Sequence, residues 1–265
     1  LILAFICATT LLAMGGAARL AWPRLNTLGL VLWPAAILGL LGALNEFAHP
    51  AAGFGWLAWP LAVATMLVFL RARESRYDIL VPALHATMYW LTGALIVWET
   101  HWLVSRAADG IWPAAAALAA AAAWVLATLR LRERISWPLA AHVRTYLYVG
   151  CGGALTAVSI ATLVANVVSA GDATPLPYVP LLNPLELVSV FVFRVLMRWL
   201  GVLERSAATF VLARRQRAVL AGLFAWFLLT MTVGRAVHHW AGVPFTVDDL
   251  ADSTIMQTSL SIVWG

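Results

Sequence analysis

Apolar runs of about 20 residues recur along the whole chain, and short polar segments separate them. One such run spans the ~30 Å hydrocarbon core of a bilayer as a single α-helix. The pattern predicts eight full spans, at 1–18, 27–44, 51–70, 79–101, 111–129, 146–168, 185–203 and 218–237. A ninth apolar run starts near Thr254. The sequence therefore predicts an all-α integral membrane protein, a polytopic helical bundle.

The composition supports this class. Hydrophobic residues make up 63% of the chain and charged residues 11%, whereas soluble domains have roughly half and a quarter. No soluble domain fits between the runs, so we expect residues 1–265 to form a single transmembrane domain. The sequence starts inside one apolar run and stops inside another. We therefore expect the chain to be an excerpt of a longer polytopic protein. Cys7 and Cys151 both fall in predicted spans and indicate no disulfide framework.

The loops alternate in charge. All 17 basic residues are arginine, and most of them lie in the loops at 19–26, 71–78, 130–145 and 204–217. The positive-inside rule makes these loops cytoplasmic and puts the first residue, Leu1, on the outer side. Arginines beside spans explain the net charge of +5, so no nucleic-acid partner is predicted. The Ala-, Leu- and Arg-rich, lysine-free composition favours a bacterium, and we expect a multi-pass protein of the inner (cytoplasmic) membrane.

Two segments, near 33–74 and 81–133, share ordered landmarks. Both contain an X-Pro pair, Gly-Ala-Leu, an acidic residue followed by histidine, Trp-Pro, and Leu-Arg-x-Arg-Glu. Each would form a helical hairpin with Glu46 or Glu99 at its outer tip. The pattern predicts tandem parallel repeats, unlike the inverted repeats of many transporters. The alternative is a chance match between helices rich in Ala, Leu and Trp.

The densest polar stretch runs from residue 234 to 257 and follows the eighth predicted span. Histidine and carboxylate groups form the commonest acid–base pairs. If the outer tips converge, they surround one outward-facing cavity under the proline-rich loop at 169–186. The candidate catalytic residues are then Glu46, Glu99, His101, His238, His239 and Asp248. The alternative is a set of separate helix ends, each solvated alone or acting as a cap.

Two arginines are candidate substrate-binding residues. Arg194 lies nine residues into the span at 185–203, ~14 Å deep at the helical rise, and Arg235 lies at a span end. Charges inside a membrane are costly and often functional, and a guanidinium suits phosphate. The alternative for Arg194 is a bond to carbonyls or a carboxylate within the bundle. His85 and His142 are interpreted as packing groups. No recognised metal spacing is present, so no metal site is predicted and no cofactor is identified.

Two motifs carry a family resemblance. They are Pro-Leu-Pro-Tyr-Val-Pro-Leu-Leu-Asn-Pro-Leu-Glu at 175–186 and Arg-Ala-Val-His-His-Trp-Ala-Gly-Val-Pro at 235–244, followed by Gln257 and Leu-Ser-Ile-Val-Trp at 260–264. With these motifs the chain resembles a bacterial family of large predicted polytopic membrane proteins, catalogued as a domain of unknown function. The resemblance covers the whole chain and implies further spans on both sides. It implies no activity and no catalytic residues.

Three classes of function fit these patterns. The favoured one is a role in cell-envelope metabolism, with a polar outward-facing site that acts on a lipid-linked or periplasmic substrate. A transporter or channel is the first alternative, although few carboxylates are buried and no inverted repeat is found. A structural or assembly protein of the envelope is the second. The lipid bilayer is a partner in each case, and the sequence does not indicate an oligomeric state or decide whether the protein is an enzyme.

Overall fold

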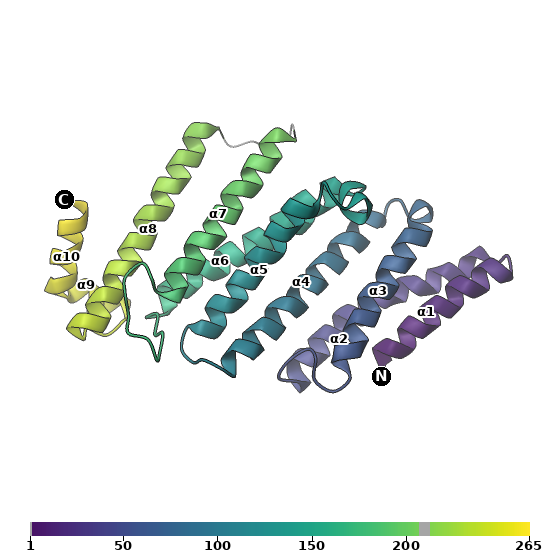
Figure 1. The fold of residues 1–265 in the computed structure, drawn as a ribbon, viewed down its shortest axis with the longest axis horizontal. Coiled ribbons are helices and arrows are strands. Elements are labelled where there is room, and N and C mark those ends of the chain that lie inside the picture. Colours follow the sequence, from purple (N-terminus) through teal and green to yellow (C-terminus); the bar gives the residue numbers. More distant parts are fainter. Residues whose placement is uncertain (1, 207–212) are drawn as a thin grey trace. The chain divides into compact units, whose positions relative to one another are not determined.

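A computed structural model describes residues 2–206 and 213–265, and every regular element in them is helical (Figure 1). The prediction of an all-α protein is confirmed. The α-helices are α1 (Ile2–Arg19), α2 (Leu32–Glu46), α3 (Gly55–Arg73), α4 (Val81–Ser105), α5 (Trp112–Leu131), α6 (Gly152–Val168), α7 (Pro184–Arg205), α8 (Arg214–Ala241), α9 (Val247–Asp252) and α10 (Thr254–Trp264). Short 3₁₀ or π turns join them: η1 (Pro23–Val31), η2 (Glu74–Arg76), η3 (Ser136–Ala140) and η4 (Thr145–Cys151).

Seven helices in the described residues are long and apolar enough to cross a membrane. They are Ile2–Arg19, Pro23–Glu46, Gly55–Arg76, Val81–Ser105, Trp112–Leu131, Thr145–Val168 and Arg214–Ala241. Each overlaps a predicted span. The predicted span at 185–203 forms α7, which is not among the seven. Any 18-residue stretch of α7 contains Arg194, Arg198 and either Glu186 or Glu204, so the helix is amphipathic rather than uniformly apolar.

The structure divides into two compact units, which we describe separately. Unit 1 comprises Leu1–Trp102 and Leu131–Gly150, and unit 2 comprises Leu103–Arg130 and Cys151–Gly265. Leu1, whose side of the membrane was predicted, lies outside the described residues. In sequence, a short segment connects α2 to α3 and another connects α4 to α5, but that either pair forms the expected hairpin stays a prediction. That they are related repeats stays a prediction, as does a single transmembrane domain.

The core of unit 1 forms where α1, η1, α2 and α3 pack together. Trp33, Met66 and Phe69 are at least 96% buried there. The indole N–H of Trp33 donates to the Leu84 carbonyl at 2.9 Å, so its one polar atom is satisfied. Gly29 of η1 makes the close contact with α3 feasible, because a Cβ at this position would lie 2.3 Å from the Phe69 ring. A larger residue at position 29 would push η1 away from α3.

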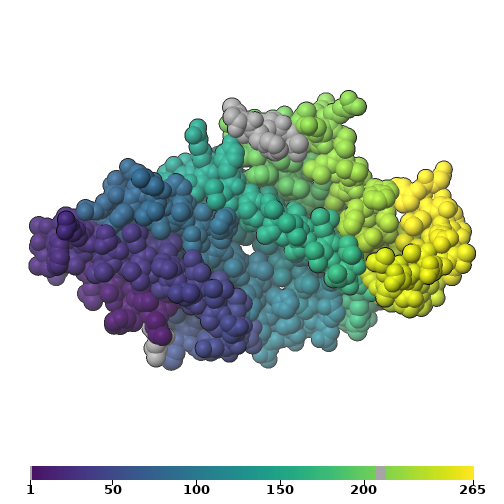
Figure 2. Space-filling model, turned by 180° about the vertical axis from the view of Figure 1, so that it is seen from behind, coloured from purple at the N-terminus to yellow at the C-terminus, as the bar shows by residue number. Residues whose placement is uncertain are grey.

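Unit 2 is built on α6, α7 and α8, each of which contacts the other two. The chain between α6 and α7, residues 169–183, has no helix of its own; we call it the proline loop. After the C-terminal end of α8, α9 and α10 follow, and α10 packs back against α8; in Figure 2 the yellow atoms of α10 lie against the yellow-green atoms of α8. The polar side chains of unit 2 gather where the proline loop meets α6, α7 and α8.

Candidate functional site: the polar end of unit 2

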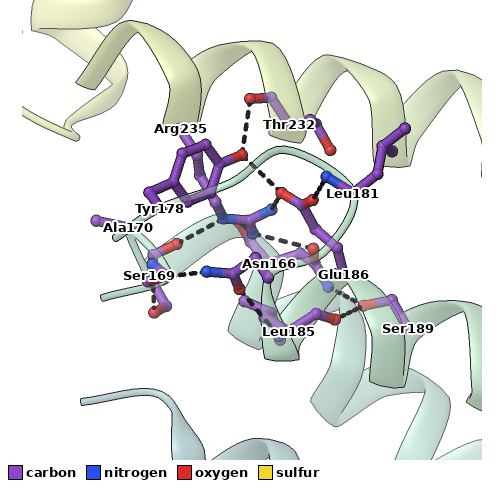
Figure 3. A network of polar contacts seen from close by, with 12 residues as sticks. Asn166, Ser169, Ala170, Tyr178, Leu181, Leu185, Glu186, Ser189, Thr232 and Arg235 are labelled. Atoms are coloured by element: carbon purple, nitrogen blue, oxygen red, sulfur yellow. Dashed lines mark hydrogen bonds and ion pairs between the residues drawn. The ribbon is translucent and has the colours of Figure 1, made fainter. Parts of the chain in front are cut away.

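Arg235 is the centre of the polar end. It lies two turns before the end of α8 and its side chain is fully buried. Its Nη2 donates to the backbone and side-chain oxygens of Asn166 at 2.9 and 3.0 Å, and its Nε to the Ser169 carbonyl at 3.3 Å (Figure 3). Its Nη1 lies 3.4 Å from Glu186 Oε1. All three nitrogens of the guanidinium therefore have protein partners.

Glu186 supplies the balancing charge and is 1% exposed. One of its oxygens accepts from the Tyr178 hydroxyl at 2.7 Å and the other from the Leu181 backbone N–H. Glu186 lies in the first turn of α7, where the helix dipole favours a negative charge. Asn183 caps the same helix by accepting from Leu185 N at 3.0 Å. The Asn-Pro-Leu-Glu sequence thus both starts α7 and places the carboxylate.

Asn166 extends the network from Arg235 down between the helices. Its amide donates to the Thr162 carbonyl and to Ser189 Oγ, each at 2.8 Å, and Ser189 Oγ donates to the Leu185 carbonyl at 2.6 Å. Asn166 and Ser189 are at most 1% exposed. Buried polar groups that are all paired fix one arrangement of the helices that carry them. The network therefore joins α6, α7 and α8 at this end.

The proline loop is held over this network from several sides. Asn183 Nδ2 donates to the Gly171 carbonyl at 2.6 Å, and residues before and at the start of α5 bind the loop through Ile111 N to Asp172 O (2.8 Å) and Trp112 Nε1 to Ala173 O (3.1 Å). Gly171 has φ +72°, a conformation that favours glycine. The loop is thus a packed cover rather than a solvated linker.

Two ionisable groups of the proline loop have shifted pKa values. Hydrogen bonds from the Thr174 side chain and backbone lower the pKa of the exposed Asp172 carboxyl. Burial, reinforced by the bond to Glu186, raises the pKa of Tyr178, so its hydroxyl keeps its proton. The Tyr178 ring also stacks on His239, with centroids 4.6 Å apart.

The two adjacent histidines end α8 and bond in different directions. His238 Nδ1 donates to the Val243 carbonyl at 2.7 Å, and His239 Nε2 donates to the Ala170 carbonyl of the proline loop at 2.8 Å. Both are partly exposed. Asp248 lies exposed in the first turn of α9, and its neighbour Asp249 bonds Thr246, the N-cap of that helix.

An apolar groove of about 320 Å³ lies between α6, α7 and α8. It shares Thr162 and Ser189 with the polar network just described. The stacked rings of Phe193 and Phe224, with centroids 4.2 Å apart, form part of its wall. The remaining lining residues are Ser159, Leu163, Val192, Leu196, Leu220, Leu223 and Phe227. An apolar groove thus adjoins the polar end of the same helices.

The other predicted catalytic residues belong to unit 1. Glu99 of α4 accepts from His49 Nδ1 and from the Ala51 backbone N–H, each at 3.2 Å. His49 stacks on Trp102 with ring centroids 3.5 Å apart. Glu46, the last residue of α2, and His101 of α4 are both exposed. The structure therefore pairs Glu99 with His49, while one site shared by Glu46, Glu99, His101, His238, His239 and Asp248 stays a prediction.

Arg194 lies on the exposed side of α7, on the same face as Arg198 one turn later. No ion pair or hydrogen bond joins its side chain to any residue that the structure describes. The alternative expected for Arg194 was a bond to a carboxylate within the bundle. Arg235, and not Arg194, makes such a bond, to Glu186. A substrate contact for either arginine stays a prediction.

Sequence reasoning did not select Asn166, Tyr178, Asn183, Glu186 or Ser189 as site residues. A signal for three of them was present, because Tyr178, Asn183 and Glu186 all lie in the motif at 175–186 and Arg235 begins the motif at 235–244. The two motifs that looked distinctive in the sequence are thus the two that bond each other through Glu186 and Arg235.

Comparisons with known proteins identify a family. No curated protein and no solved structure matches the chain. A family model described as "Predicted membrane protein (DUF2339)" matches residues 1–265. The match covers the whole chain, including both motifs and all seven candidate spans. The chain therefore belongs to this family of predicted membrane proteins of unknown function.

Proposed function

We propose that this membrane protein binds a lipid-linked substrate at unit 2. The hydrocarbon chain of the substrate would occupy the groove between α6, α7 and α8, and its polar head would lie at the end covered by the proline loop. One observation carries the proposal: the apolar groove shares Thr162 and Ser189 with the buried Arg235–Glu186 network.

The groove has the chemistry of a site for a hydrocarbon chain. Its lining side chains are almost entirely apolar, and its volume of about 320 Å³ falls in the size range of small-molecule sites. Two of its three walls, α6 and α8, belong to candidate membrane spans. Because the groove lies within those spans, the surrounding medium would be lipid rather than water, and a lipid chain is its natural occupant.

The polar end has groups suited to a polar head. His239, Asp172 and Asp248 are at least partly exposed there, whereas the charges of Arg235 and Glu186 are used to hold the helices. Histidines and carboxylates can bind or exchange protons with hydroxyl and phosphate groups. We place this end on the outer side of a bacterial inner membrane, in cell-envelope metabolism, from the alternation of arginine-rich loops.

A blocking substitution tests the groove. In Ser159→Trp the indole would fill the groove, and in the control Ile160→Trp it would point away, because Ile160 is 57% exposed and does not line the groove. Native mass spectrometry of the protein extracted in mild detergent would measure co-purified lipid. We expect Ile160→Trp to retain the lipid carried by the wild type and Ser159→Trp to lose it. Equal lipid occupancy in both variants, or none in the wild type, would overturn the proposal.

The sidedness is tested by cysteine labelling in intact cells, in a background with Cys7 and Cys151 replaced by alanine. Ser75 and Ser136 are exposed in arginine-rich loops, and Leu176 is 58% exposed in the proline loop. We expect Leu176→Cys to react with a membrane-impermeant thiol reagent, and Ser75→Cys and Ser136→Cys to react only with permeant reagents. The reverse pattern would place the polar end in the cytoplasm.

Transport is the second candidate, and one observation favours it. Arg194 and Arg198 form a cationic face on α7 that the described residues leave uncovered. If α7 crosses the bilayer, such a face needs water or an anion beside it, because charges in contact with lipid are costly. Anion flux into vesicles containing the protein, lost in Arg194→Gln, would support transport over lipid binding.

A further inference from the structure

Three side chains from distant parts of unit 1 meet at its arginine-rich end. Glu74 begins η2 directly after α3, His85 lies in the second turn of α4, and His142 lies between the π turns η3 and η4. One potential ligand atom from each lies within 4.8 Å of the others. Glu74 Oε2 is 2.9 Å from His142 Nε2 and 3.7 Å from His85 Nε2. The chain between these residues folds so that two imidazoles and one carboxylate converge.

One atom of this cluster lacks a partner. The His85 side chain is fully buried, and its Nε2 makes no hydrogen bond. Its distance of 3.7 Å from the carboxylate is too long for a hydrogen bond. Buried polar atoms are nearly always paired, so an unpaired ring nitrogen aimed at a carboxylate and a second imidazole needs an explanation. A ligand that bonds all three groups supplies one.

The surrounding side chains are arranged as an outer shell of a metal site. His85 Nδ1 lies 3.0 Å from the Tyr146 hydroxyl, which fixes the ring and leaves Nε2 pointing into the cluster. The indole N–H of Trp137 donates to Glu74 Oε2 at 3.0 Å. Histidine ligands typically bond a second group through the other ring nitrogen, and ligating carboxylates are likewise held by donors.

We propose that Glu74, His85 and His142 bind a divalent transition-metal ion of the zinc class. Two imidazoles and one carboxylate form a common three-ligand set for zinc and for non-haem iron, both of which leave a position open for water or substrate. Donor atoms ~2.1 Å from a tetrahedral ion lie ~3.4 Å apart. Two of the three observed separations, 2.9 and 3.7 Å, bracket this spacing, and the third, between the two imidazoles, is at most 4.8 Å, so side-chain movements would bring all three donors to the ion.

The site would be reachable from solvent. The side chains of Glu74 and His142 are 29% and 20% exposed, while His85 forms the buried floor. The competing account is a plain ion pair between Glu74 and a protonated His142, beside a neutral His85. Arg71, whose guanidinium lies over the Trp137 ring at 5.1 Å from its centroid, adds positive charge nearby and would favour the metal-free pair. Measured affinity decides between these accounts.

Metal binding is measured on the tag-free full chain in detergent. After removal of metals with a chelator, Zn²⁺ is added in an isothermal titration, and Co²⁺ is added separately to record its visible absorption bands. We expect one Zn²⁺ per chain and Co²⁺ bands typical of a protein site with nitrogen and oxygen ligands. We expect Glu74→Gln and His142→Ala to weaken binding by more than about 100-fold, beyond the 10–100-fold typical of outer-shell changes. Both residues are partly exposed, so we expect these variants to fold. Circular dichroism, which measures helicity, checks this.

Tyr146→Phe and His49→Ala complete the test. Tyr146→Phe removes only the hydroxyl that orients His85, and we expect it to weaken zinc binding about tenfold. His49 and Glu99 form a histidine–carboxylate pair in the same unit, at 3.2 Å, and among the described residues no third potential ligand joins them. His49→Ala is therefore the matched control and should bind zinc like the wild type. Absence of stoichiometric zinc, wild-type affinity in His142→Ala, or loss of binding in His49→Ala would each overturn the proposal.

Discussion

The Arg235–Glu186 pair of unit 2 and the Glu74–His85–His142 cluster of unit 1 differ in how completely their polar atoms are paired. In unit 2, each nitrogen of Arg235 and each oxygen of Glu186 has a protein partner, and both side chains are essentially inaccessible. In unit 1, His85 is equally buried but keeps an unpaired nitrogen that faces Glu74 and His142. The guanidinium and carboxylate of unit 2 are saturated by protein partners, whereas the unit 1 cluster keeps one ring nitrogen without a hydrogen bond.

This difference assigns opposite roles to two groups of residues of similar chemistry. Removing one partner of a buried ion pair leaves an uncompensated charge, so the unit 2 network braces the helices that carry it. In unit 1, Tyr146 and Trp137 hold His85 and Glu74 in place, but His85 Nε2 has no hydrogen bond. This is expected of a binding site before its ligand arrives. Burial alone does not separate these cases; the partner of each polar atom does.

The largest expected effect comes from breaking the unit 2 brace. Arg235→Met would leave Glu186 buried and unpaired, and we expect a loss of about 3–5 kcal/mol in the free energy of unfolding. Unfolding of the protein from mixed micelles, followed by circular dichroism, would measure it. Arg194→Met is the control, because Arg194 is exposed on α7 and its loss should cost less than about 0.5 kcal/mol. A loss below 1 kcal/mol in Arg235→Met would show that the network is not a brace.

The next effect is specific to unit 1. Zinc at 100 times its dissociation constant should stabilise the wild type by about 2.7 kcal/mol, because it binds the folded state alone. In Glu74→Gln the same zinc concentration should change stability little. Thermal unfolding with and without zinc, each at fixed protein concentration, provides the comparison. Equal stabilisation of the wild type and Glu74→Gln would place the zinc elsewhere.

A smaller effect tests how α7 begins. Asn183 accepts from Leu185 N as the N-cap and donates to Gly171 O, so Asn183→Ala should cost about 1–2 kcal/mol. Asn45 is exposed and bonds only within its own helix, to Leu41 O, which makes Asn45→Ala the control. We expect chemical unfolding to separate the two variants. If both lost equal stability, the attachment of the proline loop to α7 would contribute nothing.

The smallest effect concerns pH. The pKa of Asp172 is lower in the folded protein because Thr174 donates to the carboxylate. The bonds therefore contribute stability above the ordinary pKa of about 4, and that contribution is lost as the pH falls through the lowered folded pKa. Asp172→Asn should flatten the acid side of the stability curve without changing stability trends above pH 6. An unchanged acid slope in this variant would assign it to other carboxylates.

The helices were predictable from the sequence because bilayer-length apolar runs leave few alternatives. Seven of the eight predicted spans coincide with candidate membrane helices. The span at 185–203 was different: it is the helix α7, but Glu186, Arg194 and Arg198 make it amphipathic. An apolar count cannot distinguish a helix that crosses lipid from one that packs a single apolar face against its neighbours.

The sites were less predictable, because they depend on contacts between distant residues. Arg235 was selected, but its partner Glu186 lies 49 positions earlier, and no local spacing connects the two. His85 and His142 were interpreted as packing groups, because the sequence gives no reason to bring Glu74, 68 positions before His142, beside them. The Asn183 cap of α7 depends only on neighbouring residues, but the sequence analysis did not single it out.

One comparison tests the contrast between the units most directly: the unfolding temperature of Glu186→Gln and of Glu74→Gln, each measured with and without zinc. The two substitutions are isosteric and remove the same charge. We predict that Glu186→Gln lowers the unfolding temperature of the metal-free protein and retains the upward shift caused by zinc. Glu74→Gln should keep a nearly wild-type unfolding temperature without metal and lose the zinc shift. If both variants retained the zinc shift, or if both lost metal-free stability to the same degree, the assignment of a brace to unit 2 and a metal site to unit 1 would be contradicted.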